Sequence, residues 1–347
     1  MGRLAPAFKY AGVAFRQWVG AELMLTNPIV KKLRFPLKLL VSVVLLYLLF
    51  SHVDVAGVVA VLSGAKLKFL FVGLCLFVAA QLLSSVRWGL LARSVGFNNS
   101  FGEFATFYWI GMFLNLFFPS IVGGDVGRTF YLVQSRNVSA SSKLWWTGKA
   151  AVSVLADRAI GLIMLVWMTA VTLLVYPVST LPESVRYITF LLALILPFSG
   201  CLLTFLSRFF RHWFHSFGES VADALDTYKF QGRLALLVLI LAAAIHTLTS
   251  SMYLPIGWSL GVDLPPGYTF VTYAVVVLLS TLPITFYGIG VRESALVFML
   301  GQIDVPPEKA LAIGLLWFVT VISLSLAGGV AFLMRKSFTG SPGSNPG

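Results

Sequence analysis

The sequence has 347 residues, of which 58% are hydrophobic and only 11% are charged. Soluble domains ordinarily carry about 25% charged residues, so this composition excludes an ordinary soluble protein. The formal net charge of +12 would suggest nucleic-acid binding in a soluble chain. Here the basic residues gather in the N-terminal arm and in loops between apolar runs. This distribution is typical of a membrane protein whose basic loops set its orientation and contact anionic lipid headgroups. We therefore expect an all-α polytopic membrane protein that does not bind nucleic acid.

Residues 1–35 form a basic arm with interleaved aromatic residues. Such a mixture suits either a helix on the membrane surface or an unstructured leader, and its charge places it in the cytoplasm. A transmembrane domain is expected over 36–335. The tail, 336–347, is rich in glycine, serine and proline and is expected to be disordered.

Apolar runs then follow along the whole chain, and a full membrane span needs about 20 apolar residues. We predict spans at about 36–51, 68–92, 101–118, 158–176, 187–207, 233–258, 268–282 and 308–334. Together they predict a helical bundle of about 8 full spans.

The distribution of lysine and arginine among the loops predicts which side of the membrane each loop faces. The loop near 208–233 is basic and Arg335 and Lys336 follow the last run, so both should face the cytoplasm, whereas the links 177–186 and 259–267 should face outside. Counting crossings then requires two further returns, within 119–157 and 283–302. These are expected to be re-entrant or half-helix hairpins of opposite sense, which is typical of an inverted repeat.

Both returns carry the same pattern of residues. In each, a proline ends an apolar run, glycines follow, and an acidic and a basic residue open a new helix. The candidate residues are Gly123, Gly124, Asp125 and Arg128 in the first segment, and Tyr287, Gly288, Gly290, Arg292 and Glu293 in the second. A helix break at membrane depth presents backbone N–H groups to a cavity, and an adjacent arginine suits it to a phosphate.

A plainer interpretation also stands, in which each arginine lies near the headgroups and pairs only with its neighbouring carboxylate. Lys149, Asp157 and Arg158 follow the first motif in the sequence. We expect Lys149 or Arg158 to line the same cavity as Arg128, and the alternative is an anchor at the cytoplasmic interface. An adjacent Asp–Arg pair points about 100° apart on a helix, so each side chain needs another partner. Arg87 is expected to extend toward the interface.

Neither a catalytic centre nor a metal site is expected. The two cysteines, Cys75 and Cys201, have no CxxC spacing, and the histidines do not form ligand spacing with cysteines or carboxylates. No phosphate-binding GxxxxGK[ST] loop occurs, so any transport must use an ion gradient or run downhill. No cofactor is expected.

Three motifs resemble those of the lysylphosphatidylglycerol synthase transmembrane-region family, also called the flippase-like or UPF0104 family. Phe118 to Arg128 resembles its PGSVGGDxxR signature, Asp157 to Leu162 its DRxxGL element, and Pro283 to Glu293 its PxxxGGLGVRE element. The sequence departs from the pattern at Ser120, where the family usually has glycine, and at Tyr287, where it has the first of two glycines. The bulk of Tyr287 could narrow a cavity.

The resemblance implies a bacterial or archaeal plasma-membrane protein that moves charged lipids, such as aminoacyl-phospholipids or polyprenyl-phosphate-linked sugars. Larger members carry a soluble acyltransferase domain, for which no sequence follows here, so we expect no enzyme activity. The alternative function is an accessory subunit that presents lipid to a separate membrane-associated glycosyl- or aminoacyltransferase. A membrane-embedded enzyme acting on a lipid phosphate ranks last, because neither segment pairs a nucleophile with a base.

Overall fold

The structure is a computed structural model, and every structural statement below concerns the residues it describes. These are 40–51, 53–117, 122–136, 139–175, 183–196, 205–209, 216–229, 231–281 and 288–338. All regular structure within these ranges is helical. The prediction of an all-α protein is therefore confirmed. The predicted basic arm, most of the tail and Tyr287 lie outside the described residues.

The helices that carry the argument follow one another along the whole described chain. They are Leu40–Ser51, α3 (Val55–Ser63), α4 (Leu67–Ser94), α5 (Phe101–Phe117), α6 (Val122–Gln134), α7 (Ala140–Val175), α8 (Glu183–Ile195), α10 (Ser216–Lys229), α11 (Gly232–Ser251), α12 (Tyr253–Ser259), α13 (Pro266–Thr281), α14 (Val291–Gly301) and α15 (Pro307–Phe338). A short helical turn covers 205–209.

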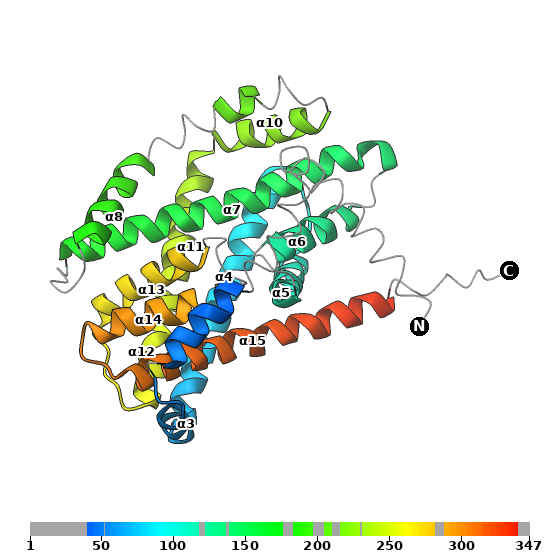
Figure 1. The fold of residues 1–347 in the computed structure, drawn as a ribbon. Helices are drawn as coiled ribbons and strands as arrows, with labels where there is room; N and C mark the ends of the chain where they lie inside the picture. Colours follow the sequence, from blue (N-terminus) through cyan, green and yellow to red (C-terminus); the bar gives the residue numbers. More distant parts are fainter. Residues whose placement is uncertain are drawn as a thin grey trace.

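Two long helices, α7 and α15, form opposite sides of the bundle (Figure 1). They have 36 and 32 residues, which at 1.5 Å per residue makes them about 54 and 48 Å long. Helices α5 and α6 connect them, because α6 packs against α7 and α5 packs against both α6 and α15. On the other side of α7, α10 lies against its surface.

The outer faces of the long helices are apolar. Within the described residues, four helices are long and apolar enough to cross a membrane: Leu67–Ser94, Ser142–Val175, Gly232–Ser259 and Pro307–Met334. In each of these four helices, at most 44% of the most apolar 18-residue stretch is buried inside the protein. Exposing so many large apolar side chains to water would be unfavourable, whereas in a bilayer the same side chains contact lipid. The chain is therefore a polytopic membrane protein.

The predicted spans correspond closely to observed helices. The runs at 68–92, 101–118, 268–282 and 308–334 match α4, α5, α13 and α15 to within a few residues. The span at 158–176 is only the second half of α7, which begins earlier, and 233–258 is divided at Met252 between α11 and α12. Helix Leu40–Ser51 and α3 form a bent pair that would make a fifth apolar crossing among the described residues. The total of eight spans stays a prediction.

Both interrupted segments open short helices. Helix α6 has 13 residues and α14 has 11, each well below the roughly 20 residues that a bilayer crossing requires. Their lengths fit the half-helices expected at these points. Helix α6 directly follows residues 118–121, which lie outside the described part of the chain, and α14 follows the turn 288–290.

Glycines hold α5 tightly between its two neighbours. A Cβ atom on Gly124 of α6 would lie 2.3 Å from the carbonyl oxygen of Gly111 on α5, and one on Gly328 of α15 would lie 2.0 Å from the carbonyl oxygen of Trp109. Real side chains cannot approach backbone so closely. Gly124 of the first motif therefore has a packing role.

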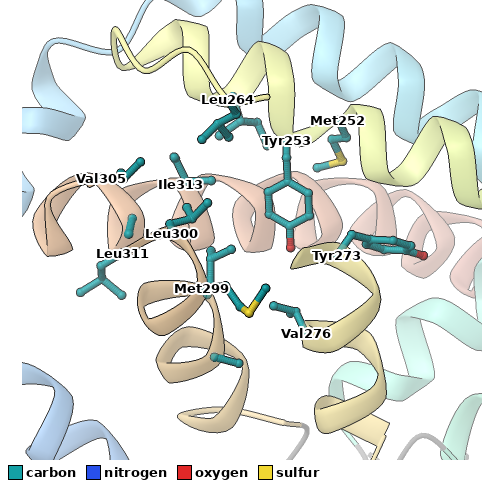
Figure 2. Packing of buried hydrophobic residues seen from close by; sticks show 14 of the residues in the cluster. Met252, Tyr253, Leu264, Tyr273, Val276, Met299, Leu300, Val305, Leu311 and Ile313 are labelled. Carbon is teal, nitrogen blue, oxygen red and sulfur yellow. The ribbon is translucent and has the colours of Figure 1, made fainter. Parts of the chain in front are cut away.

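The largest hydrophobic core of the described residues is centred on α12, α13, α14 and α15. In Figure 2, Tyr253 of α12 points toward Met299 of α14 and Val276 of α13, and Leu300 and Ile313 pack beside them. This core fixes α14, and with it the second motif, against α15.

Candidate functional site

Five charged side chains gather where α4, α6 and α7 meet. We refer to them as the α6–α7 charge cluster, and they are Arg87 on α4, Asp125 and Arg128 on α6, and Asp157 and Arg158 on α7. They combine residues of the first motif with Asp157 and Arg158 of the DRxxGL element, which lies about 30 residues later in the sequence. The sequence therefore predicted four of the five members, and the structure adds Arg87.

Asp157 is the inner acceptor of the cluster. Its Oδ1 accepts a hydrogen bond of 2.8 Å from Nε of Arg87, and its Oδ2 lies 3.4 Å from Nη1 of Arg128. Side-chain exposure is 3% for Asp157, 7% for Arg87 and 6% for Arg128. One carboxylate is thus shared between two buried guanidinium groups. Without it Arg87 would lack its ion-pair partner in a region of low dielectric constant, and Arg128 would keep only its pair with Asp125.

Asp125 is the outer acceptor. It pairs with Arg128 one turn away on the same helix and with Arg158 of α7, whose Nε and Nη2 both donate to it, the second at 2.8 Å. The exposed fraction rises to 17% for the Asp125 side chain and 36% for that of Arg158. The cluster is therefore layered, and its outer pair is the part that a ligand can reach first.

Aromatic rings complete the surroundings of Arg128. Its guanidinium carbon lies 4.8 Å from the ring centre of Tyr108 and 5.3 Å from that of Trp88. Rings at such distances stabilise a cation through their negative faces. Trp88 is fully buried and donates from its indole N–H to Ser153 of α7 at 3.3 Å. Arg128 is consequently held on two sides by rings and on two sides by carboxylates.

A buried histidine, His246, lies next to the inner layer. Nε2 of His246 is 2.8 Å from the carbonyl oxygen of Gly161, which only accepts, so this nitrogen carries the hydrogen. Nδ1 forms a hydrogen bond of 3.1 Å with the hydroxyl group of Tyr273. A Cβ atom on Gly161 would lie 3.5 Å from Nη1 of Arg87. That Nη1 is buried and has no hydrogen-bond partner within the described chain.

The glycines of the first motif serve the helix contact. The amide of Gly124 donates to Oδ1 of Asn115 at 2.6 Å, and both Gly123 and Gly124 are buried. The expectation that this break presents its glycine amides to a ligand is therefore wrong for Gly124, because a side chain of α5 already occupies that donor.

The second motif forms a centre of its own. Gly288 and Gly290 have φ of +73° and +87°, a left-handed conformation that favours glycine. The amide of Gly290 donates to Oε2 of Glu293 at 2.8 Å, and Glu293 also pairs with Arg292. Glutamate at this position caps the helix, as in a capping box.

Arg292 is 6% exposed and its guanidinium lies 4.5 Å from the ring centre of Phe318 and 5.3 Å from that of Trp317, both on α15. Each motif thus places a buried arginine between a carboxylate and aromatic rings. The neighbouring carboxylate pairs predicted by the plainer interpretation are present in both motifs, although the arginines are buried. Arg292 contacts α14 and α15, whereas Arg128 contacts α4, α5, α6 and α7.

Lys149 does not join the α6–α7 charge cluster through its observed contacts. Its ammonium lies 3.9 Å from the ring centre of Trp145 and 5.6 Å from that of Trp146, near the start of α7. Arg136 stacks on the same Trp146 at 3.4 Å. Of the two alternatives for Lys149, these contacts favour an anchor among aromatic side chains over a partner of Arg128.

Arg87 was expected to extend toward the interface, and this expectation is wrong. It is 6% exposed because Asp157, 70 residues later in the sequence, accepts its Nε–H. An arginine inside a long apolar run is a signal in itself, since such residues usually face the interior of a bundle. The DRxxGL element could have suggested a partner, because Asp157 and Arg158 point in different directions on α7.

The structure also describes two open pockets. One, of about 420 Å³, is lined by Asn98, Asn99, Glu103, Ser135 and Arg136. The other, of about 270 Å³, is lined mainly by hydroxyl and apolar side chains of α7, α11 and α13. The expected cavity joining the two motifs is not among these pockets in the described part of the chain.

The comparisons with known proteins agree with the motifs. A family model described as "Lysylphosphatidylglycerol synthase TM region" matches residues 36–329. The chain is 20% identical to the UPF0104 membrane protein MJ1595 of Methanocaldococcus jannaschii over 326 residues, which cover 86% of this chain and 94% of that protein. It is 24% identical to the UPF0104 membrane protein PH1989 of Pyrococcus horikoshii over 131 residues, which cover 38% of this chain and 37% of that protein. No solved structure matches.

Proposed function

Because the chain belongs to the lysylphosphatidylglycerol synthase TM-region family, we propose that it binds the phosphate of a charged membrane lipid at the α6–α7 charge cluster and moves the headgroup across the bilayer. The sequence expectation of a plasma membrane of bacterial or archaeal type, with both termini in the cytoplasm, forms part of this proposal. The family match covers the membrane region of these proteins, and the transport step is our inference.

The observation that carries the proposal is the composition of the cluster. Three guanidinium groups share two carboxylates, and the outer arginine, Arg158, keeps 36% of its side chain exposed. Placing an arginine at the centre of a bilayer costs about 2.5–3.5 kcal/mol on insertion scales, so such residues are usually functional. Guanidinium groups bind phosphate oxygens through paired N–H donors. A lipid phosphate at Arg158 would therefore gain charge-assisted hydrogen bonds.

The proposal is tested by reconstituting the purified protein in liposomes that contain a phospholipid with a fluorescent headgroup. A membrane-impermeant quencher removes only the outer-leaflet signal in liposomes without translocation, so quenching beyond that share reports translocation of lipid from the inner leaflet. We expect translocation by the wild type and its loss in Arg158→Ala. Lys143→Ala is the matched control, because Lys143 is an exposed cation on the same helix.

An absence of translocation for every phosphate-bearing lipid would contradict the transport step. If lipid still bound, and a transferase co-purified from native membranes, the accessory-subunit function would replace it. Equal translocation by wild type and Arg158→Ala would remove the α6–α7 charge cluster from the mechanism.

A further inference from the structure

The α6–α7 charge cluster has a surplus of positive charge and of hydrogen-bond donors. Its three arginines remain ionised under all physiological conditions, and its two carboxylates leave a formal charge of +1. Nη1 of Arg87 is buried without a hydrogen-bond partner in the described residues. A buried group of charges is most stable when it is neutral and its donors are paired.

Asp125 occupies a position in which it would compete with a bound anion for the donors of Arg158. Both Nε and Nη2 of Arg158 donate to its carboxylate, and the same carboxylate pairs with Arg128. Carboxylate and phosphate match the planar donors of arginine in the same way. Asp125 and Arg158 are also the most exposed members of the cluster, at 17% and 36%.

Resting on the proposed function, we propose that the site selects a headgroup with a single negative charge, a phosphodiester, and that Asp125 sets this selectivity as a built-in anion beside the ligand. One added negative charge neutralises the surplus of the cluster. A phosphomonoester carries about 1.5 to 2 negative charges at pH 7, and a diphosphate carries more. Either would leave the buried site negative, next to the carboxylate of Asp125.

The experiment compares two soluble lipids that share their acyl chains and glycerol backbone. Dihexanoyl phosphatidylglycerol is a phosphodiester, and dihexanoyl phosphatidic acid is a phosphomonoester. Binding to the full-length protein in a neutral detergent is measured by calorimetry at roughly pH 8, about two units above the second phosphate pKa, where the monoester is a dianion. We expect the wild type to bind the diester about tenfold more tightly than the monoester.

Asp125→Asn removes the built-in anion and should shift the preference toward the monoester by about tenfold or more. Asp125→Glu, which keeps the charge, should retain the preference of the wild type. Asp263→Asn makes the same charge change at an exposed position of the α12–α13 link and should leave both affinities unchanged. Thermal melting of each variant verifies that it folds.

The wild-type comparison needs no variant, so the inference stays testable if Asp125→Asn does not fold. Tighter binding of phosphatidic acid by the wild type would overturn the inference while leaving the lipid-binding function intact. An equal effect of Asp125→Asn on both lipids would overturn the role of Asp125. If the wild type bound neither lipid, the proposed function itself would fail.

Discussion

At the scale of single residues, the cluster separates structural charges from accessible ones. Asp157 is almost fully buried and pairs with two arginines, whereas Arg158, its neighbour in the sequence, is partly exposed and reaches toward α6. Adjacent residues of one helix point about 100° apart, which allows the two roles. Substitutions at these two positions should therefore have different consequences.

Asp157→Asn should destabilise the protein strongly. It leaves Arg87 buried without a compensating charge and removes one of the two carboxylates that pair with Arg128. Breaking a buried ion pair costs on the order of 3–5 kcal/mol. The melting temperature in detergent should fall, and expression should fall with it. A variant that melted like the wild type would contradict the assignment of Asp157 as the central acceptor.

Arg158→Ala should behave in the opposite way. An ion pair that is partly open to solvent contributes about 1 kcal/mol or less, so stability should change little. Binding of phosphate-bearing lipid should be lost. The informative comparison is between melting temperature and lipid affinity measured on the same preparation, and loss of both properties together would argue for a purely structural role.

The residue scale also shows what local sequence patterns can predict. Four cluster members lie in recognisable motifs, where an acidic and a basic residue interrupt an apolar sequence. The pairing of Arg87 with Asp157 depends on how α4 packs against α7, and no local pattern contains that information. Likewise, the sequence around Gly124 predicts a break in a helix, whereas in the structure Gly124 packs against the backbone of Gly111 on another helix.

At the scale of helices, glycines decide how α5, α6 and α15 approach one another. Helix α6 must lie close to α5 for Arg128 to reach the rings of Trp88 and Tyr108, and Gly124 permits this distance. The glycines of the second motif have a different function, since Gly290 adopts a positive φ at the start of α14.

Gly124→Ala should separate α5 from α6. The added Cβ atom would lie 2.3 Å from a backbone oxygen, and overpacking of this kind typically costs about 1–3 kcal/mol. Gly102→Ala, in α5 with nothing within 4 Å of its Cβ position, should be neutral or stabilising, because alanine favours helix by about 1 kcal/mol. Melting curves of the two variants test this, and equal stability would be inconsistent with the packing described here.

Gly290→Ala should destabilise the start of α14. Alanine tolerates a φ of +87° poorly, and its Cβ atom would lie 2.9 Å from that of Leu45. Gly301→Ala, at the other end of α14 with open space around it, is the control. Limited proteolysis near 282–290 should increase in the first variant and not in the second. Similar cleavage of both would contradict the role of the positive φ.

At the scale of the whole molecule, the sequence predicted the class and the positions of most helices because hydrophobic length is read directly from composition. Its predicted runs at 68–92 and 308–334 agree with α4 and α15. The predicted return over 119–157 was less accurate, since α7 continues without interruption from Ala140 to Val175. Apolar run length locates the lipid-facing part of a helix, whereas the helix itself extends as far as its backbone hydrogen bonds do.

The arrangement of the two motifs also belongs to this scale. Each places a buried arginine between a carboxylate and aromatic rings, but in contact with different helices. The proposed mechanism uses the first centre, because Arg158 makes it accessible. Arg292 is enclosed by its own carboxylate and by α15.

The central claim is that a lipid phosphate binds at the α6–α7 charge cluster, and the most direct measurement is a structure of the full chain in lipid nanodiscs that contain an anionic phospholipid. We predict density for a phosphate within hydrogen-bond distance of Arg158, on the exposed side of its pair with Asp125. A phosphate bound at Arg292 or at the basic surface, with the cluster unchanged and without lipid beside it, would contradict the account.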